Sequence, residues 1–301
     1  MRFEGEAVRL TAGAMQLDLA PAMGGAILGW TDGGVALLRD SMARTAEPFS
    51  VRDCASFPLI PFSNRVAHGA FPFAGQVYAL PKDSRDARHA MHGNALYAAW
   101  DVKSATANAL ELALAYRAGE GDAPFFPFSY DAEQLYRIGH DSLAIELTIT
   151  NRDTRPFPAG LGHHLYFASE PDTTVSFEAA NFWINGDDGL PARPADAGMD
   201  EFSRGHLIGS KALDNCFAGW HGAASIRRPS KGFELDITAT EAFRHAVLFT
   251  PPGQPFFAFE PVSHLNDAIH RITPAQTHGL KILSPDEIFR ASIVIRKIAL
   301  Q

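Results

Sequence analysis

Apolar and polar residues alternate with a period of two along several stretches of the chain. Successive side chains of a strand point to opposite faces, so such a stretch predicts a strand with one face on a core and the other in solvent. The alternation is clearest in residues 109–115, 142–150, 233–238 and 291–298, and shorter stretches lie at 17–19 and 174–177. The pattern therefore indicates antiparallel sheets.

Helical periodicity is weak, and only residues 81–91 and 286–289 predict helical turns. The 25 Gly and 20 Pro residues occur at frequent intervals, as many connections between strands require. We therefore predict an all-β protein, a sandwich or a barrel, with residues 1–301 in a single domain. Residues 185–206 are rich in Gly, Pro and Asp and predict a long loop, either a wall of a binding site or a surface loop.

Composition narrows the classes of partner. A net charge of −8 and a pI near 5.8 argue against a nucleic acid, since no dense basic patch interrupts the acidic balance. The first ten residues lack the apolar run of a signal peptide, and no stretch approaches the ~18 apolar residues of a membrane helix. The two cysteines, Cys54 and Cys216, are predicted to be buried thiols. We expect a cytoplasmic protein with no nucleic acid or membrane partner.

Two candidate sites lie in the first third of the chain. Asn64 and Arg65 follow the apolar run FPLIPF, so Arg65 either offers its donors to ligand hydroxyls or pairs with a buried carboxylate. His89 and His92 stand in HAMHG. An isolated HxxH pair is a weak metal signal, because a zinc site needs further protein ligands.

Three more candidates lie further along. His163 and His164 are adjacent, so a strand would point them to opposite faces, one functional and the other structural. Glu260 follows FFAF and precedes a proline that we expect to end the strand. Apolar surroundings would raise the pKa of this carboxyl and make it a better base, whereas an edge position would leave it in water. Asp214 stands alone in an apolar setting, where it either binds a hydroxyl or caps a turn.

The order of these elements resembles the aldose 1-epimerase (galactose mutarotase-like) family. The Asn64-Arg65 pair, the G-x-F-x-F-x-G-x-x-Y-x-L run of residues 69–80, the HxxHG element and the HxYF and EP elements follow one another as in that family. The resemblance spans residues 57–269, most of the chain. It implies a large antiparallel β-sandwich of the galactose mutarotase type, a free aldose as substrate, and no cofactor or metal.

The resemblance also implies roles for particular residues. His164 corresponds to the proton donor and Glu260 to the proton acceptor, and the residues that correspond to sugar ligands are Asn64, Arg65, His92 and Asp214. Three local departures leave these residues in place: His163 replaces a usual aromatic, Leu165 replaces a usual proline, and residues 94–97 read Asn-Ala-Leu-Tyr instead of carrying a Gly-Trp or Gly-Phe pair. The last departure leaves the identity of the sugar open.

Three alternatives remain open from the sequence. A hexose-6-phosphate mutarotase would need an arginine cluster to bind the dianion, and Arg52, Arg85 and Arg88 are the candidates for it. A glycoside hydrolase would use Asp214 and Glu260 as its two carboxyl groups. A carbohydrate-binding protein without activity would need no acid–base pair. Both a monomer and a homodimer are compatible with the sequence.

Overall fold

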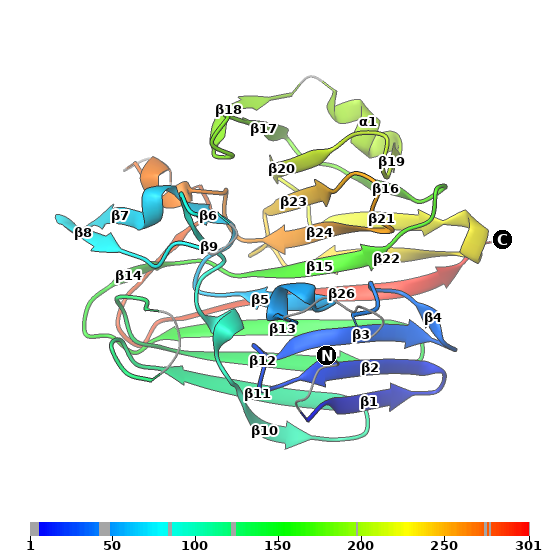
Figure 1. Ribbon diagram of the computed structural model, residues 1–301, viewed down its shortest axis with the longest axis horizontal. Helices are drawn as coiled ribbons and strands as arrows, with labels where there is room; N and C mark the ends of the chain where they lie inside the picture. Colours follow the sequence, from blue (N-terminus) through cyan, green and yellow to red (C-terminus); the bar gives the residue numbers. More distant parts are fainter. Residues whose placement is uncertain are drawn as a thin grey trace.

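The computed structural model describes residues 6–41, 49–83, 86–121, 125–196, 198–273, 276 and 278–300. Two large antiparallel sheets stack face to face with one hydrophobic core cluster between them (Figure 1). The predicted all-β class and the large antiparallel sandwich are thereby confirmed.

Within the described residues the first sheet has eleven strands, and one of them, β4 (Val35–Ala36), pairs with β3 beside the main order. In spatial order the others are β1 (Val8–Ala12), β2 (Met15–Ala20), β3 (Ala26–Asp32), β5 (Ser56–Leu59), β15 (Gly162–Ala168), β24 (Phe256–Val262), β23 (His245–Thr250), β20 (Leu213–Ala218), β17 (Asn181–Asn185) and β18 (Pro191–Ala195).

The second sheet has nine strands. In spatial order they are β10 (Asp101–Ala105), β11 (Ala109–Tyr116), β12 (Tyr130–Ile138), β13 (Ser142–Asn151), β26 (Ile288–Ala299), β22 (Phe233–Ala239), β21 (Ala223–Arg228), β16 (Thr174–Phe177) and β19 (His206–Leu207).

Smaller elements complete the fold, and several of them gather with the β7–β8 hairpin at the left of Figure 1. Three two-stranded pairs are β6 (Arg65–Val66) with β9 (Ala90–Met91), β7 (Ala70–Phe73) with β8 (Gln76–Ala79), and β14 (Phe157–Ala159) with β25 (Lys281–Leu283). The helical turns are η1 (Val51–Asp53), η2 (Ala67–Gly69), η3 (Ala95–Tyr97), η4 (Pro229–Lys231), η5 (Ala268–Arg271) and the α-helix α1 (Met199–Arg204).

All six stretches with clear alternation are strands, in β11, β13, β22, β26, β2 and β16. Two predictions of helical turns are wrong. Residues 286–289 run into β26, whose side chains alternate between core and solvent, and the described part of 81–91 holds turns and β9. The predicted loop 185–206 is not one loop either, because it contains β18, α1 and the start of β19.

A buried chain of hydrogen bonds crosses from one sheet to the other beside β15. The His163 ring lies 2.5 Å from Ser56 Oγ through Nδ1 and 3.3 Å from Tyr136 Oη through Nε2. Tyr136 Oη also lies 2.5 Å from Gln134 Oε1, and the Gln134 amide donates to the Gly24 carbonyl at 3.1 Å. Because buried polar groups are costly unless they are paired, this chain fixes β15 and β5 of the first sheet against β12 of the second.

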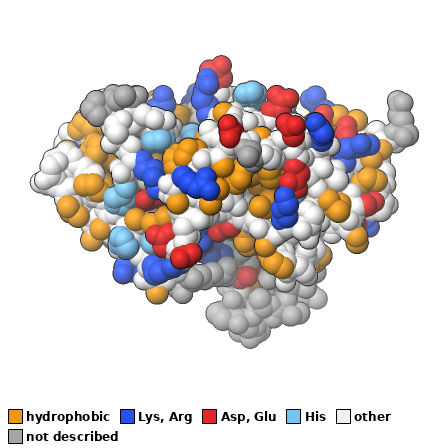
Figure 2. Space-filling model, turned by 90° about the horizontal axis from the view of Figure 1, so that it is seen from above, with side chains coloured by type: hydrophobic (Ala, Val, Ile, Leu, Met, Phe, Trp, Pro, Cys, Tyr) orange, Lys and Arg blue, Asp and Glu red, His pale blue; other side chains and the backbone are white. Residues whose placement is uncertain are grey.

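The molecular surface shows no concentration of one sign of charge on the face seen in Figure 2, where Lys, Arg, Asp and Glu side chains are interspersed. Among the residues that the structure describes, no helix is long and apolar enough to cross a membrane.

Candidate active site

His164 and Glu260 face each other across two neighbouring strands. In the ladder between β15 and β24, Gly162 pairs with Val262 and Leu165 with Phe259, so the two residues between them on each strand come opposite one another. His164 Nε2 lies 3.1 Å from Glu260 Oε1, and the side chains are 8% and 2% exposed. The sheet itself therefore brings together two groups that are far apart in the sequence.

Pro261 does not end the strand as we expected, since β24 continues to Val262. On the β23 side Pro261 pairs with Ala246, whereas on the β15 side the ladder has no recorded pair for Glu260 or Pro261. A proline lacks the backbone N–H that a ladder uses, and it is tolerated where a ladder is interrupted. Glu260 therefore lies inside a central strand and is buried, so the interpretation as an edge residue facing water is wrong.

Aromatic rings enclose the His164 imidazole. The ring of Phe57, which pairs with His164 across β5 and β15, has its centroid 4.7 Å away, and the Tyr166 ring, two residues along β15, lies at 4.3 Å. The guanidinium carbon of Arg39 lies 3.5 Å from the centroid of the Tyr166 ring, and the guanidinium donates to the carbonyls of Arg52 and Cys54. The imidazole is thus desolvated and has a fixed cation nearby.

This environment shifts the pKa of both groups toward their neutral forms. Burial, and then the charge of Asp214, raise the pKa of Glu260 well above its ordinary value, although Arg65 and Arg52 oppose that shift. Burial, followed by the cations of Arg39 and Arg52, lowers the pKa of His164 well below its ordinary value. Both shifts therefore act against a charged imidazolium–carboxylate pair.

One further oxygen and one further nitrogen of this pair are available for a ligand. Neither Glu260 Oε2 nor His164 Nδ1 has a hydrogen-bond partner among the described residues, and both atoms are buried. A buried polar atom without a partner costs on the order of 1–3 kcal/mol. Such a cost is typical of functional sites, where a ligand supplies the missing partner.

The structure places Asn64, Arg65 and His92 beside this pair. The His92 ring lies edge-on to the His164 ring at 5.4 Å, and its Nδ1 accepts a hydrogen bond from the Asn64 backbone N–H at 3.1 Å. Burial lowers the pKa of His92 well below its ordinary value, so this imidazole is neutral. Asn64 Oδ1 accepts a hydrogen bond from the Arg65 backbone N–H at 2.9 Å, and Arg65 is the first residue of β6.

Arg65 joins Asp214 to the site and pairs with a second carboxylate. Its Nη1 lies 3.2 Å from Asp214 Oδ2, and its Nε lies 3.1 Å from Asp86 Oδ2. Asp214 belongs to β20 and does not cap a turn. Sequence reasoning missed Asp86, whose only signal was its place in a charged segment between two candidate motifs. The two possibilities considered for Arg65, ligand binding and pairing with a carboxylate, are compatible in this arrangement.

Part of the segment 185–206 forms a wall beside Arg65. The Cα of Gly189 faces the Arg65 guanidinium so closely that an added Cβ would lie 3.4 Å from Nε. The neighbouring carbonyl of Asp188 contacts His89 Nε2 at 3.1 Å. His89 is thus held by the backbone on both sides, because its Nδ1 accepts from the His68 N–H, and it does not join His92 in a common site. Among the described residues no group of three or more His, Cys, Asp or Glu side chains is placed to hold a metal ion.

A second ionic cluster, which sequence reasoning did not assign to the sugar site, flanks the pair. Arg52 is 9% exposed and donates to the Asp83 carboxylate and, at 3.0 Å, to the Tyr97 hydroxyl. Arg52 and Arg88 do not converge on an empty anion site: Arg52 is paired with Asp83, and Arg88 lies 3.5 Å from Asp86. Arg85, the third candidate for binding a phosphate, lies outside the described residues.

Together, the stacked antiparallel sheets and the buried imidazole–carboxyl pair define a β-sandwich protein whose site is equipped to exchange protons with a small polar ligand. The chain belongs to the aldose 1-epimerase family, whose model matches residues 6–296. This family implies an isomerase type of enzyme that acts on a sugar.

Individual relatives agree with this assignment. The uncharacterized protein YphB of Escherichia coli (strain K12) is 28% identical over 296 residues, which cover 95% of this chain and 97% of YphB. A solved structure from Escherichia coli K12 has a TM-score of 0.87 at 27% identity and covers 98% of this chain and 99% of its own. The galactose mutarotase-like protein of Clostridium acetobutylicum has the same fold, with a TM-score of 0.85 at 18% identity over 99% of this chain and 96% of its own.

Proposed function

We propose that this protein is an aldose 1-epimerase that interconverts the α- and β-anomers of a free sugar, with His164 as acid and Glu260 as base. The observation that carries the proposal is the buried contact of 3.1 Å between His164 Nε2 and Glu260 Oε1. This contact places a group that can accept a proton beside one that can donate a proton, and mutarotation requires one proton to be removed and one to be delivered.

In the proposed reaction the protons and the electron pair are exchanged between the sugar and the two side chains alone. Glu260 takes the proton of the anomeric hydroxyl, the bond between C1 and the ring oxygen breaks with its electron pair on that oxygen, and His164 protonates the oxygen. The open aldehyde rotates about C1–C2. In the reverse direction the ring hydroxyl attacks the other face of C1, returns its proton to His164, and the carbonyl oxygen recovers a proton from Glu260.

The roles require a carboxylate at Glu260 and an imidazolium at His164, the two forms that burial disfavours. Sugar hydroxyls that donate to Glu260 stabilise the carboxylate, and the cations of Arg65 and Arg52 already favour it. The contact between His164 and Glu260 gives the proton a direct path. We infer that hydrogen bonds from the bound substrate stabilise the carboxylate–imidazolium pair that reacts.

The charges around the pair favour a free aldose over a hexose 6-phosphate. Arg65 is shared by Asp86 and Asp214, and Arg52 is paired with Asp83. A phosphate dianion would have to displace these carboxylates or lie close to them, which costs electrostatic energy. Hydroxyl groups, by contrast, can donate to the carboxylates and accept from the arginines. Asn64, Arg65, His92 and Asp214 are therefore proposed as the residues that bind the sugar.

The test is the rate of exchange between anomers, followed by NMR or polarimetry on a panel of aldoses and their 6-phosphates. Glu260→Gln and His164→Gln are each expected to lower the rate by roughly 10²–10⁴-fold while the fold is retained. Glu241→Gln is the matched control, because the Glu241 side chain is 91% exposed and its substitution should leave the rate unchanged. Near-full activity of Glu260→Gln would refute the proposed roles. Acceleration of the 6-phosphates alone would instead establish the phosphosugar alternative.

A further inference from the structure

The Tyr166 side chain contacts the proposed acid on β15. Its ring centroid lies 4.3 Å from that of the His164 imidazole, two residues earlier on the same strand, and the two ring planes are tilted by 31°. Alternate residues of a strand point to the same face of the sheet, so the two rings lie on one face. The orientation of the imidazole therefore depends on where the Tyr166 ring is held.

Arg39 holds the Tyr166 ring. Its guanidinium carbon lies 3.5 Å from the centroid of that ring, a contact that a planar guanidinium makes by stacking on an aromatic face. The backbone N–H of Arg39 also donates to the Tyr166 carbonyl at 2.8 Å. The centroid of the Phe256 ring lies 4.8 Å from the guanidinium carbon and 5.5 Å from the Tyr166 centroid. Arg39 is thus tied to Tyr166 by its side chain and by its backbone.

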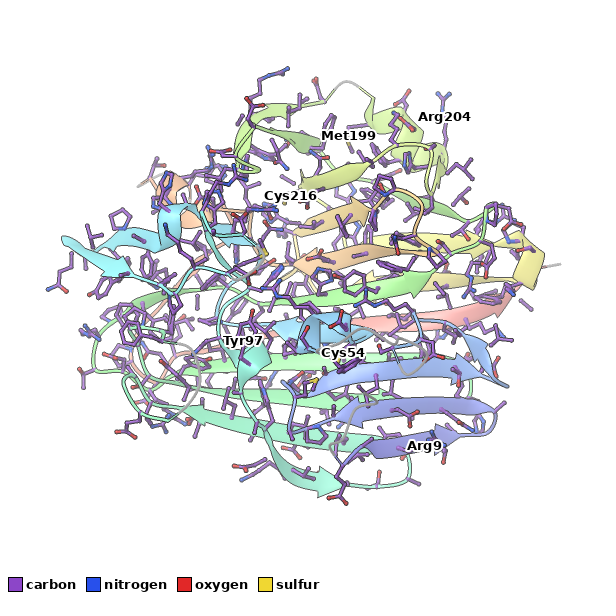
Figure 3. The ribbon with its side chains drawn as sticks, viewed as in Figure 1. Arg9, Cys54, Tyr97, Met199, Arg204 and Cys216 are labelled. Carbon is purple, nitrogen blue, oxygen red and sulfur yellow. The ribbon has the colours of Figure 1, made fainter. Side chains whose placement is uncertain are left out.

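The backbone in turn fixes the guanidinium. Arg39 is buried, and it donates to the Cys54 carbonyl at 2.6 and 3.2 Å and to the Arg52 carbonyl at 2.7 Å. Cys54, labelled in Figure 3, directly follows η1 in the part of the chain that leads into β5. A lysine has a single ammonium group and could not make these directed hydrogen bonds while stacking on the ring. The position therefore uses the shape of arginine as well as its charge.

Arg39 also acts on the charge of the imidazole. Burial has the largest effect on the pKa of His164, and the cation of Arg39 is the next influence that lowers it. Other ionisable groups face or adjoin the same ring: they are Glu260 of β24, His92, Arg52 of η1 and His163 of β15. An acid with a lowered pKa gives up its proton more readily, so this electrostatic effect suits a proton donor.

We propose that Arg39 is a positioning residue for the proposed acid. Its guanidinium holds the Tyr166 ring, and that ring holds the His164 imidazole in the orientation that points Nε2 at Glu260. Arg39 acts through Tyr166 and takes no part in binding the sugar. The role rests on the proposed function, because it concerns the step in which His164 donates a proton.

The first experiment measures kcat and KM for anomer exchange in variants of Arg39 and Tyr166. Arg39→Met should lower kcat roughly threefold to tenfold, because the acid is less well oriented, and should leave KM within about twofold of the wild type. Arg39→Lys should recover only part of this loss, since it restores the charge but not the stacked plane. In a Tyr166→Leu background Arg39→Met should have little further effect, because the two side chains act as a unit. Losses that simply multiply in the double variant would overturn the route through Tyr166.

Arg228→Met is the matched control, because Arg228 makes the same kinds of contact on β21 of the second sheet. Arg228 is buried, its guanidinium carbon lies 4.9 Å from the centroid of the Phe233 ring, and it donates to the Ala36 carbonyl at 2.6 Å. Its loss should lower the urea midpoint and leave kcat unchanged. An equal fall of kcat in Arg39→Met and Arg228→Met would show that Arg39 is merely structural and would overturn the proposal.

An NMR measurement separates this inference from the proposed function, because it needs no activity. The ring protons of His164 lie beside the Tyr166 ring, so ring currents displace their signals, which are identified by their loss in His164→Gln. Arg39→Met should move these signals toward their positions in Tyr166→Leu, and Arg228→Met should not. Unchanged His164 signals in Arg39→Met would overturn the inference and leave the proposed function intact. Absence of exchange for every sugar, with the signals moved as expected, would overturn the proposed function instead.

Discussion

Acidification from about pH 6.5 to about pH 5 is expected to destabilise this fold, because several buried histidines stay neutral in it. Burial lowers the pKa of His163 to about 3, and burial is also the main reason why the pKa values of His245 and His264 fall to about 4. Their ordinary value is 6.5. A depressed pKa means that the stabilising contribution is complete above pH 6.5 and is lost as the pH falls toward the pKa of the folded state.

The magnitude follows from the width of the window. Between about pH 6.5 and pH 5 each of these histidines binds a proton only in the unfolded chain, which costs about 2 kcal/mol at 1.36 kcal/mol per pH unit. Three such groups cost about 6 kcal/mol, against a typical total of about 5–15 kcal/mol. His92 and His164 shift in the same direction. Glu260 acts in the opposite sense, because its raised pKa stabilises the fold as the pH falls toward 4.5.

The assay is urea unfolding at a series of pH values, followed by circular dichroism. His163→Gln should reduce the loss of unfolding free energy across this window by about 2 kcal/mol, since one titrating group is removed. His221→Gln is the matched control, because the His221 side chain is 69% exposed. A wild-type urea midpoint that is the same at the two pH values would refute the reasoning. So would a His163→Gln variant whose free energy of unfolding depends on pH as steeply as that of the wild type.

Three further predictions concern the site, the backbone and the thiols. Asp214→Asn removes a charge that raises the pKa of Glu260, so the pKa that the pH dependence of kcat/KM reports for Glu260 should move to lower pH. Gly93→Ala should lower the free energy of unfolding by roughly 2–4 kcal/mol in urea, because its Cβ would lie 2.1 Å from the Ile60 carbonyl oxygen. Gly253→Ala is the control: its Cβ would meet open space, so it should cost only ~1–2 kcal/mol for the left-handed backbone. Burial raises the pKa of Cys54 and of Cys216 to about 12, so a thiol reagent such as Ellman's should react slowly with the folded protein and quickly after unfolding.

The long strands could be predicted from the sequence because alternation is a local signal. Residues 142–150 show it clearly, and they form β13 in the middle of the second sheet. The signal fails where an element is set by its neighbours. Residues 286–289 carry charges and a short apolar pair, but pairing with β13 extends β26 back to Ile288. Pro261 stays inside β24 because it pairs with β23 on one side, and on the other side the ladder with β15 is interrupted at this position.

In the site, too, some features follow from local sequence and others from the pairing of distant strands. His164 and Glu260 could be proposed from the order of motifs, but their placement opposite each other depends on the pairing of β15 with β24, which no local pattern encodes. Sequence reasoning missed Asp86 and Asp83, the carboxylates that pair with Arg65 and Arg52, because these pairs form only in the folded chain. His163 differs again: its position next to His164 predicted the opposite face, and its ring does contact Ser56 and Tyr136 between the sheets.

The pairing of β15 with β24 has a consequence for how this fold can change. His164 and Glu260 lie opposite each other on two paired strands, so the sheet limits how far their separation can vary. Asp83, Tyr97 and Gly189, which lie around Arg52 and Arg65 beside this pair, belong to turns and short elements, and such segments tolerate substitution. If the pair acts as proposed, changes in these turns would alter which sugar fits, while the strands that hold the acid and the base stay the same.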